Sequence, residues 1–563
     1  MSVTRIANGT IVDGTGLPAF VGDVFVAGDR VVDVVPREPS LPGRTCPDME
    51  TVDATGLLVT PGFVDAHAHS DAYLVLEPDA PSKVTQGITT EINGQCGGSV
   101  APRFGEARLS GDWAALLGNR LTWRSLAEYR DVLAAAKPAV NTIQFVGHNT
   151  LRSSVVGYAG RAATPEELDA MRRLLEQALD EGGWGLTTGL IYQPGKYATA
   201  AEVEALAAVA AARGGLYATH MRSEGDRILE SIDEVIALAR KTGIRAEISH
   251  LKTSGPKNWH KIDAVLEKVG RAVDEGCLLG SDRYPYCAAG TDLDVLLPDW
   301  AQEGAAVAER VRLQTPDLRA RIVREIDALD RDWATVMIGG TWHADNKRFC
   351  GKTVREIIEW SNGRMVECDQ TSAPPNAQTP NPPNLQPPKP PTPQPSKRPD
   401  LTPGELICRI LEKDGCKTGA FFFGMNEANL DRIFAQPWIV PGSDASLRAP
   451  WGPLAADHPH PRAYATMPEF YRRVRALGVS REETIARMTS VPARRFGICG
   501  RGVLAKGAFA DLVVWDEASF AAKATYLRPH QFTDGVRLVM VNGVVPYANG
   551  VFTGRRGGRF LAR

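Results

Sequence analysis

Short β-like runs that follow predicted helices recur through the centre of this chain, and they restrict its fold more than any other feature. One predicted helix begins after Thr164, where a capping box precedes a proline, and it ends at a Gly-Gly pair. The β-like run GLTTGL comes next, and further helix-and-strand pairs follow it. These runs end in turn at Leu190, His220, His250 and Asp282, about every 30 residues, which is the length of one βα unit.

Repeated βα units of this kind predict an α/β protein with parallel strands. They close naturally into a TIM-like (β/α)8 barrel, whose chemistry lies at the carboxyl ends of the strands. We assign this barrel to residues 61–497. A doubly wound open sheet has the same rhythm, so the spacing of the runs alone leaves that alternative open.

The two ends of the chain have a different texture. Residues 1–60 and 498–563 contain short β-rich runs separated by glycine and aspartate turns, and the first stretch has no helical period. A chain of 563 residues is long enough for a second, smaller domain beside a barrel. We therefore expect one small β-sandwich domain assembled from both termini, with two unrelated β caps as the alternative.

Two segments interrupt the barrel pattern. Residues 287–340 form a polar and helical excursion, which we expect to cover the barrel mouth as a lid. Residues 371–400 are rich in proline, so they can neither form sheet ladders nor bury a core. We interpret them as a surface insertion of extended polyproline or disordered character, and a docking site for an SH3-like partner is the alternative.

Charge and composition argue against several classes of protein. The formal net charge of −2 gives no reason to expect nucleic acid or an anionic membrane as a partner. The apolar runs stop short of the roughly 18 residues of a membrane span, and the first residues lack the pattern of a secretory signal. The nine cysteines form no short-spaced CxxC pair, which favours a cytoplasmic location where thiols are free to bind a metal.

The strongest signal for chemistry is the segment PGFVDAHAHSD. It brings His67 and His69 to the end of a strand, and residues two apart on a strand point to the same face. Cys96 lies one βα unit later in TTEINGQCGGS, beside glycines that let a metal or a substrate approach the backbone. A lone histidine pair would be incidental more often than functional, so the residues further along decide the interpretation.

Three more candidate ligands end later β-like runs. His220 and His250 lie one repeat apart, and Asp444 ends the run WIVPGSD. We expect all six residues to converge on one mouth, and imidazole, thiolate and carboxylate together suit zinc. In the alternative, Cys96 is a small buried thiol and the histidines satisfy carbonyl groups of the core, which would require several coincidences at strand ends.

Longer motifs surround these residues: PGFVDAHAHSD, GITTEINGQCGGS, GHNTLR, GLTTGLIYQPGKYA, ATHMRSEG, ISHLK, RYPYCAAGT, PGSDAS and HPHPRAY. Through them the chain resembles the amidohydrolase superfamily and, within it, the D-aminoacylase (N-acyl-D-amino-acid deacylase) family. The terminal pieces GVLAKGAFADLVVWD and VNGVVP are similar to the split β-domain of that group, so the resemblance covers nearly the whole chain except the Pro-rich insertion. Gln95 departs from the family's GNCG and leaves the neighbouring ligand intact.

The resemblance implies a metal centre with two positions. Cys96, His220 and His250 would hold one tightly bound zinc ion. A second, weaker or vacant position, with Cys96 as a candidate shared ligand, would be formed by the remaining candidates His67, His69 and Asp444. Relatives such as hydantoinases and dihydroorotase bridge two metals with a carboxylated lysine from the fourth strand, whereas the fourth strand here reads GLTTGL and has none.

The resemblance also implies the reaction, which is hydrolysis of the amide bond of an N-acyl amino acid, of D configuration in that family. Zinc lowers the pKa of a bound water from ~16 toward ~7. Asp444 would accept the proton of this water and pass it to the departing amine, or, in the alternative, would act only as a metal ligand. Tyr192 or Tyr284 would donate a hydrogen bond to the developing oxyanion.

The carboxylate of the product amino acid needs a cationic partner. By resemblance, Arg462 in HPHPRAY and Lys252 in SHLK would clamp it, and arginine suits bidentate recognition of a carboxylate. From the residues alone, Arg462 is more simply a surface charge. Tyr284 or Tyr286, together with Thr291, would line the pocket at the root of the excursion.

Other readings of the same residues compete with this one. His148, Arg222 and Glu224 also lie near strand ends, and we expect structural pairing for each. A cyclic amidase or a lactonase would use the same metal site. A non-catalytic scaffold is disfavoured because such descendants lose ligand histidines, and all of them stand here. We expect a small-molecule substrate and neither nucleic acid nor a membrane as partner.

Overall fold

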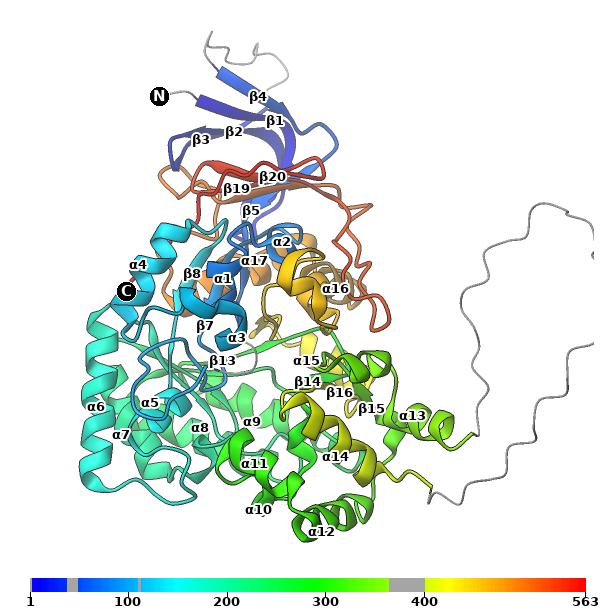
Figure 1. The fold of residues 1–563 in the computed structure, drawn as a ribbon. Helices are drawn as coiled ribbons and strands as arrows, with labels where there is room; N and C mark the ends of the chain where they lie inside the picture. Colours follow the sequence, from blue (N-terminus) through cyan, green and yellow to red (C-terminus); the bar gives the residue numbers. More distant parts are fainter. Residues whose placement is uncertain (1–2, 38–48, 110–112, 364–399) are drawn as a thin grey trace, which may run out of the picture.

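The structure is a computed structural model that describes residues 3–37, 49–109, 113–363 and 400–563. The predicted Pro-rich insertion, residues 371–400, lies outside the described residues except for Asp400. Figure 1 shows a sheet from both chain termini at one end of the molecule and a larger α/β part below it.

Strands from both ends of the chain form one nine-stranded sheet. They are β1 (Val3–Ile11), β2 (Phe20–Ala27), β3 (Arg30–Pro36), β4 (Met49–Asp53), β5 (Leu58–Pro61), β18 (Leu512–Trp515), β19 (Val536–Val541), β20 (Val544–Ala548) and β21 (Val551–Phe552). The antiparallel pairing of β18 with β5 joins the two ends of the chain. The sheet also curls, so that its N-terminal strands approach the C-terminal segment. The Val31 N–H in β3 donates to the Ala508 carbonyl at 2.9 Å, and Ile6 and Leu512 belong to one small buried core.

Parallel strands form the centre of the molecule. One sheet of six has the order β17 (Ile439–Pro441), β13 (Leu279–Arg283), β12 (Arg245–Ile248), β11 (Leu216–His220), β10 (Gly185–Gly189) and β9 (Val146–Gly147); a sheet of three contains β6 (Phe63–Asp65), β7 (Ile88–Asn93) and β8 (Asn141–Gln144). Backbone hydrogen bonds connect the two sheets: Ala66 N–H, next to β6, donates to Pro441 O of β17 at 3.1 Å, and Trp184 N–H, next to β10, donates to Gln144 O of β8 at 2.9 Å. The α/β class and the parallel pairing agree with the sequence prediction.

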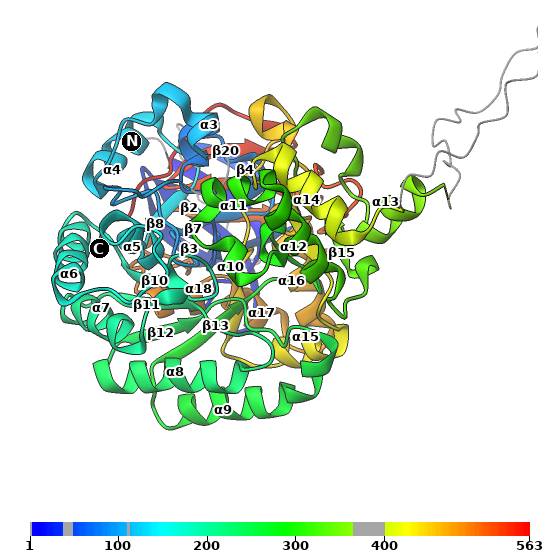
Figure 2. The ribbon, with the colours of Figure 1, turned by 60° about the horizontal axis from the view of Figure 1, so that its bottom comes forward.

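Helices follow most of these strands and surround them (Figure 2). They are α1 (Tyr73–Leu76), α2 (Pro81–Val84), α3 (Trp113–Leu117), α4 (Leu126–Ala136), α5 (His148–Val155), α6 (Pro165–Asp180), α7 (Ala200–Ala212), α8 (Ile228–Thr242), α9 (Ile262–Asp274), α15 (Glu427–Phe434), α16 (Arg462–Ala476), α17 (Arg481–Met488) and α18 (Ser490–Phe496). The predicted start of α6 is confirmed, because the Thr164 hydroxyl accepts the Glu167 N–H and Pro165 occupies the first turn. Helix α9 buries one face at helical spacing, with Val265 and Val269 both inaccessible to solvent.

The predicted strand ends are confirmed to within two residues. Strand β10 ends at Gly189, β11 at His220, β12 at Ile248 and β13 at Arg283. Strands β10, β11 and β13 are buried along their whole length and β12 is buried except at Arg245, as expected for parallel strands covered by helices. The candidate ligands therefore stand at one common edge, where the strands give way to loops.

The excursion after β13 has its own sheet and core. Its antiparallel strands lie in the order β14 (Ala289–Asp292), β16 (Gly419–Phe422) and β15 (Val336–Ile338), and its helices are α10 (Asp299–Gln302), α11 (Ala305–Gln314), α12 (Pro316–Asp327), α13 (Val354–Ser361) and α14 (Pro403–Asp414). The structure thus carries the excursion beyond the predicted residue 340, because β16 returns after the Pro-rich stretch to pair with β14. An ion pair of 2.9 Å between Lys196 and Asp299 ties α10 to a loop of the α/β part.

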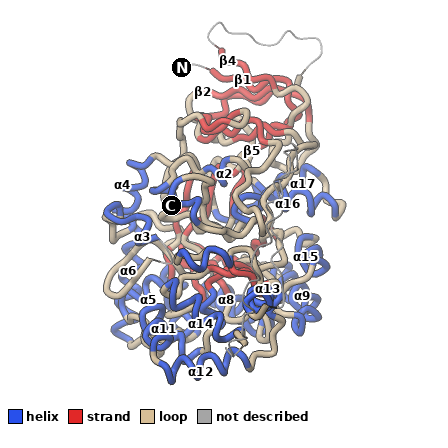
Figure 3. Tube along the Cα trace, turned by 45° about the vertical axis from the view of Figure 1, so that its right-hand side comes forward, coloured by secondary structure: helices blue, strands red, loops and turns tan. Residues whose placement is uncertain are grey.

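Figure 3 shows the strand-rich terminal sheet above the helices that surround the centre and build the excursion. None of the helices in the described part of the chain is both long enough and apolar enough to cross a membrane.

Candidate metal centre

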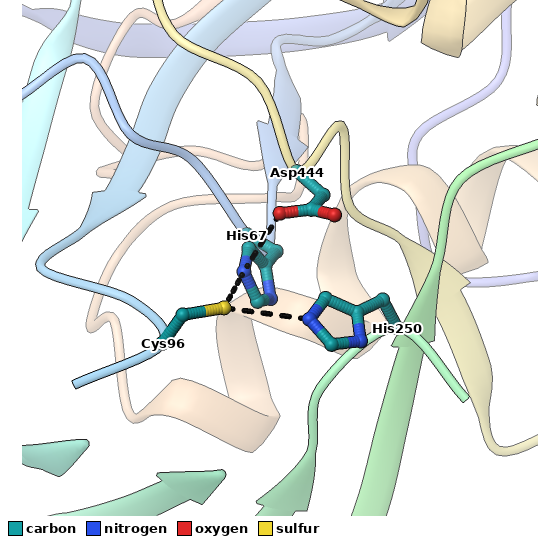
Figure 4. A group of neighbouring side chains, drawn as sticks. All are labelled: His67, Cys96, His250 and Asp444. Carbon is teal, nitrogen blue, oxygen red and sulfur yellow. Dashed lines mark hydrogen bonds and ion pairs between the residues drawn. The ribbon is translucent and has the colours of Figure 1, made fainter. Parts of the chain in front are cut away.

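Five loops and strand ends bring the candidate ligands to one edge of the parallel strands. His67 and His69 follow β6, Cys96 follows β7, and the remaining three close later strands: His220 ends β11, His250 lies two residues after β12, and Asp444 lies three residues after β17. Figure 4 shows four of these side chains pointing toward one another. The prediction that residues far apart in the sequence meet at strand ends therefore agrees with the geometry.

The backbone at this edge adopts unusual conformations. Cys96, His250 and Asp444 have positive φ angles of 52°, 38° and 48°, in the left-handed region that residues other than glycine seldom occupy. Such conformations persist only where the surroundings hold them, and they gather at functional sites. Gly442 is needed for a close approach, because a Cβ there would lie 2.6 Å from the Cβ of His67 and 2.7 Å from an Asp282 oxygen.

Cys96 stands between two imidazole rings. Its Sγ lies 3.3 Å from His67 Nε2 and 3.3 Å from His250 Nε2 (Figure 4). Asp444 Oδ1 lies 3.5 Å from His67 Nε2 and 3.1 Å from His69 Nε2. One ligand atom each from His67, Cys96, His250 and Asp444 falls within 4.8 Å of all the others, a spacing compatible with one cation between them.

His220 lies beside this group, with its ring centroid 4.6 Å from that of His250. Both of its ring nitrogens are buried, and neither has a hydrogen-bond partner in the part of the chain that the structure describes. A buried polar atom without a partner is costly, so it needs an explanation. Nε2 is 3.6 Å from a Glu224 oxygen, and His220, Glu224 and His250 form a second group of potential ligands.

Charges in the pocket favour the ligand form of both anionic groups. Burial alone would raise the pKa of the Cys96 thiol, but the charges of His67 and His250 lower it well below its ordinary value. Burial likewise opposes ionisation of Asp444, and Arg462 reverses the effect, so the pKa of this carboxyl is well below its ordinary value. The pocket therefore contains a thiolate and a carboxylate.

Two carboxylates contact the ring nitrogens of His67 and His250 that face away from Cys96. Asp282 Oδ2 lies 3.1 Å from His67 Nδ1, and its other oxygen accepts the His250 backbone N–H at 3.0 Å. Glu224 Oε1 lies 2.9 Å from His250 Nδ1 and also pairs closely with Lys252. Outer carboxylates of this kind fix the orientation of metal-binding histidines, so that the opposite ring nitrogen faces the ion.

The donor set fits a zinc ion. Zinc favours thiolate and imidazole ligands, with carboxylate as a further donor, and these are the groups that meet here. His220 supplies the independent observation, because an ion between His220, His250 and Cys96 would satisfy a buried nitrogen that has no hydrogen-bond partner in the described ranges.

The predicted clamp residues lie next to the ligands. Arg462 Nη1 is 2.8 Å from Asp444 Oδ2, and Nη2 donates to the Gly290 carbonyl at 3.2 Å. Nε of Arg462 has no hydrogen-bond partner among the residues that are described, so a donor remains for a ligand. Lys252 is buried and already paired with Glu224, so a substrate carboxylate would share this lysine.

Three further residues were predicted to face the substrate. The Tyr192 ring packs 4.8 Å from the His220 ring, and the Thr291 hydroxyl lies 3.4 Å from the Tyr192 hydroxyl. The Tyr284 hydroxyl is buried without a hydrogen-bond partner in the described chain, whereas Tyr286 turns away and its hydroxyl lies 3.5 Å from the Ala465 carbonyl. Of the two alternatives, Tyr284 is therefore the better candidate.

The structural pairs expected near strand ends are formed in part. His148 pairs with Glu202 at 2.9 Å, as expected of a structural histidine. Arg222 pairs with Glu234 at 3.0 Å, but Glu224 is part of the metal centre rather than a surface partner. Neither Glu224 nor Asp282 was predicted to support the candidate ligands; the position of Glu224 four residues after His220 in ATHMRSEG was the available signal.

Comparison with known proteins gives a consistent result. The family model described as "Amidohydrolase family" matches residues 50–320 and 427–547. The chain is 32% identical to the N-acyl-D-glutamate deacylase of Alcaligenes xylosoxydans xylosoxydans, over 99% of this chain and 96% of that protein. The two parts of the family match lie on either side of the later excursion and the Pro-rich stretch.

Two solved structures are similar over essentially the whole chain. A D-aminoacylase structure, described with a binuclear metal centre, one-metal activation and second-metal attenuation, matches with a TM-score of 0.77 and 29% identity, and covers 100% of this chain and 99% of its own. The N-acyl-D-glutamate deacylase from Bordetella bronchiseptica, in complex with zinc and a phosphonate mimic of the tetrahedral intermediate, matches with a TM-score of 0.76 and 31% identity over the same shares.

Proposed function

This chain belongs to the amidohydrolase family, and we propose that it is a zinc-dependent hydrolase of N-acyl-D-amino acids that releases a carboxylate and the free amino acid. The observation that carries this proposal is the meeting of the Cys96 thiolate with the imidazoles of His67, His220 and His250 at one buried strand edge. End-to-end similarity to D-amino-acid deacylases supports the substrate class.

The domain organisation is part of the proposal. Residues 61–497 form a (β/α)8 barrel, in which the two parallel sheets make one closed wall, and their edges are already joined by backbone hydrogen bonds. Residues 1–60 and 498–563 form a small β-sandwich domain, and the curl of the terminal sheet supports it. The excursion that begins at residue 287 acts as the lid over the site.

Two metal positions account for the six predicted ligands. Cys96, His220 and His250 hold the tightly bound zinc, which gives a partner to one of the two His220 ring nitrogens that have none among the described residues. The second position is weaker, it shares Cys96, and its other ligands are His67, His69 and Asp444. Strand β10, with the sequence GLTTG, has no lysine to bridge two ions.

When bound, zinc polarises the scissile carbonyl and makes a nearby water acidic. Asp444 is an ionised carboxylate beside the imidazoles, so it can take a proton from that water. The same carboxyl then gives the proton to the amine nitrogen as the C–N bond breaks, because an unprotonated amine leaves poorly. Tyr192 or Tyr284 donates a hydrogen bond to the negative charge on the carbonyl oxygen.

The substrate carboxylate binds at Arg462. The free Nε of Arg462 and the ammonium of Lys252 supply positive charge, and the Tyr284 hydroxyl lies in the same pocket. Thr291 brings the root of the excursion to this pocket through Tyr192. As the lid, the excursion excludes water from the metal centre.

We extend the proposal to the cellular setting. Cys96 must remain a free thiolate to bind zinc, and a reducing cytoplasm keeps thiols free. The partner is a small-molecule substrate; neither nucleic acid nor a membrane is required for this chemistry.

A matched panel of N-acetyl-D and N-acetyl-L amino acids on the zinc-loaded protein tests the proposed function. We expect turnover of the D series, loss of turnover after chelation, and recovery when zinc returns. Hydantoins and lactones belong in the same panel, because a cyclic amidase or a lactonase would use the same metal site. A folded, zinc-replete protein that hydrolyses no member of the D series would overturn the proposal.

A further inference from the structure

Arg283, the last residue of β13, is buried without a carboxylate partner. Arg283 is only 1% exposed. Within the ranges that the structure describes, no acidic side chain lies within ion-pair distance of its guanidinium. Nε and Nη1 have no hydrogen-bond partner there. Nη2 donates to the Tyr286 carbonyl at 2.8 Å and contacts the sulfur of Met425 at 2.9 Å.

An unpaired buried charge is expensive, so its presence needs a compensating interaction. Two other buried cations of this chain have a carboxylate partner: Arg152 pairs with Glu202, and Lys83 pairs with Asp65. For Arg283, the closest compensation is the aromatic ring of the next residue. Its Cζ lies 3.9 Å from the centroid of the Tyr284 ring, within the range of a cation–π contact.

Tyr284 is held by a second guanidinium as well. The Cζ of Arg462 lies 4.5 Å from the same ring centroid, and the Tyr284 hydroxyl is buried with no partner in the described chain. Two planar cations against one ring leave the phenol little freedom to rotate. The unpaired hydroxyl is therefore directed by its neighbours and free to donate to a ligand.

We propose that Arg283 is a positioning residue, which stacks on Tyr284 and holds the phenol hydroxyl where it donates to the substrate. This inference rests on the proposed function. Arg283 suits this task because its guanidinium is flat, and its bond to the Tyr286 carbonyl fixes the plane of the group. The charge acts on the phenol too: burial would raise the pKa of Tyr284, but Lys252, Arg283 and Arg462 together lower it.

A double-mutant cycle of Arg283→Gln and Tyr284→Phe tests the proposal. Arg283→Gln should lower kcat/KM by roughly ten- to a hundred-fold, the scale seen when the support of a functional group is removed. In the Tyr284→Phe background the same change should alter kcat/KM by no more than about twofold, because the hydroxyl that Arg283 positions is already gone. Both single variants should also change the same parameter, either KM or kcat.

Arg487→Gln is the matched control. Arg487 is also a buried arginine, it binds the backbone carbonyls of Ile439 and Phe434, and its Cζ lies 5.4 Å from the Phe470 ring. Its effect on kcat/KM should be equal in both Tyr284 backgrounds. If Arg283→Gln behaves in the same way, Arg283 has only a structural role and the proposal is wrong. Arg283→Lys keeps the charge and serves as a milder variant if Arg283→Gln does not fold.

A second measurement does not need turnover. Binding of a phosphonate mimic of the tetrahedral intermediate to the zinc-loaded protein, measured by calorimetry, should be weakened by Arg283→Gln and by Tyr284→Phe, and the two changes together should weaken it no more than Tyr284→Phe alone. Binding of wild-type strength in Arg283→Gln overturns the role of Arg283. A shared loss of binding in a protein that hydrolyses no N-acyl amino acid would instead overturn the proposed function and leave the contact between Arg283 and Tyr284 intact.

Discussion

Two buried groups of ionisable residues lie side by side in this molecule, and they are built in opposite ways. In the lysine cluster, Lys83 lies 3.0 Å from Asp65, 2.9 Å from Glu91 and 3.2 Å from the Ser443 hydroxyl, and Lys83, Asp65 and Glu91 have no solvent exposure. The ammonium thus has acceptors for all its protons within the chain. In the metal centre, imidazoles surround a thiolate and a carboxylate, and Cys96 Sγ lies 3.3 Å from both His67 Nε2 and His250 Nε2.

The difference shows how a binding site can be distinguished from a structural cluster. The lysine cluster contains a permanent cation, whereas the charges of the metal centre are carried by imidazoles whose protons a metal ion can displace, and the buried nitrogens of His220 have no hydrogen-bond partner within the described residues. The two groups also share backbone: Asp65 precedes His67 by two residues, and Ser443 precedes Asp444. Lys83 therefore ties together the loops that present the ligands, as a preorganised site requires.

Cys96→Ala should have the largest effect on the metal centre and leave the lysine cluster unchanged. It removes the ligand between His67 and His250, so we expect loss of both tightly bound zinc and hydrolysis, measured by metal analysis and by turnover of N-acetyl-D-amino acids. Cys408→Ala, which removes a buried thiol from the excursion, should keep both. An active Cys96→Ala variant with its full zinc content would remove the thiolate from the site.

Asp444→Ala should separate catalysis from metal binding. General acid–base groups contribute roughly 10²- to 10⁴-fold, so we expect turnover to fall at least that far while bound zinc largely persists. Asp444→Asn keeps the shape beside Arg462 and should be equally inactive. Wild-type activity in either variant would make the base assignment wrong, and loss of zinc in parallel with activity would favour the alternative that Asp444 is only a ligand.

Lys83→Met should destabilise the lysine cluster. It leaves two buried carboxylates without their cation, so the free energy of unfolding should fall by about 3–5 kcal/mol, measured by denaturant titration. The folded fraction should still bind zinc, because no metal ligand has changed. If Lys83→Met lost zinc but unfolded at the wild-type denaturant concentration, the lysine cluster would be part of the metal centre.

Glu224→Gln should have a smaller effect on the centre. Loss of an outer carboxylate weakens metal binding by roughly 10- to 100-fold, and Glu224 supports His250 directly. Competition with a chelator measures the affinity, and Glu234→Gln, which breaks the surface pair with Arg222, is the control. Equal affinities for the two variants would show that Glu224 serves Lys252 rather than the metal.

The convergence of the candidate ligands could be predicted from the sequence, whereas the residues that contact them from outside could not. His67 and His69 were expected at the end of a strand and lie two and four residues after β6, and the later candidates lie at or just after the ends of βα strands, so the βα rhythm of the sequence places them all at one edge. Cys96, His250 and Asp444 nevertheless adopt left-handed backbone conformations that no pattern of residues revealed. Such conformations depend on neighbours that become adjacent only in the folded chain.

The partners of buried charged residues were also not predicted from the sequence. Glu224 looked like a partner for Arg222 because the two are close in sequence, but Arg222 pairs with Glu234 one helix further on. Strand β16 was also missed as a return of the excursion, because it lies beyond the Pro-rich stretch and pairs antiparallel with β14. Pairing between strands that lie far apart in the chain produces no repeating residue pattern near either strand.

The pH dependence of zinc affinity tests the difference between the lysine cluster and the metal centre through the smallest expected effect. In the metal-free protein, burial and Lys252 oppose a charge on His250, but Asp444, Glu224 and Cys96 outweigh them and raise its pKa from 6.5 to about 10. Because the folded value is the higher one, the imidazolium stabilises the metal-free fold fully below pH 6.5, and this contribution is lost as the pH rises through about 10. Zinc must displace that proton, so its affinity should rise about tenfold per pH unit across this window. Chelator competition at several pH values measures the slope, and a flat profile would mean that zinc binds without displacing a proton from His250.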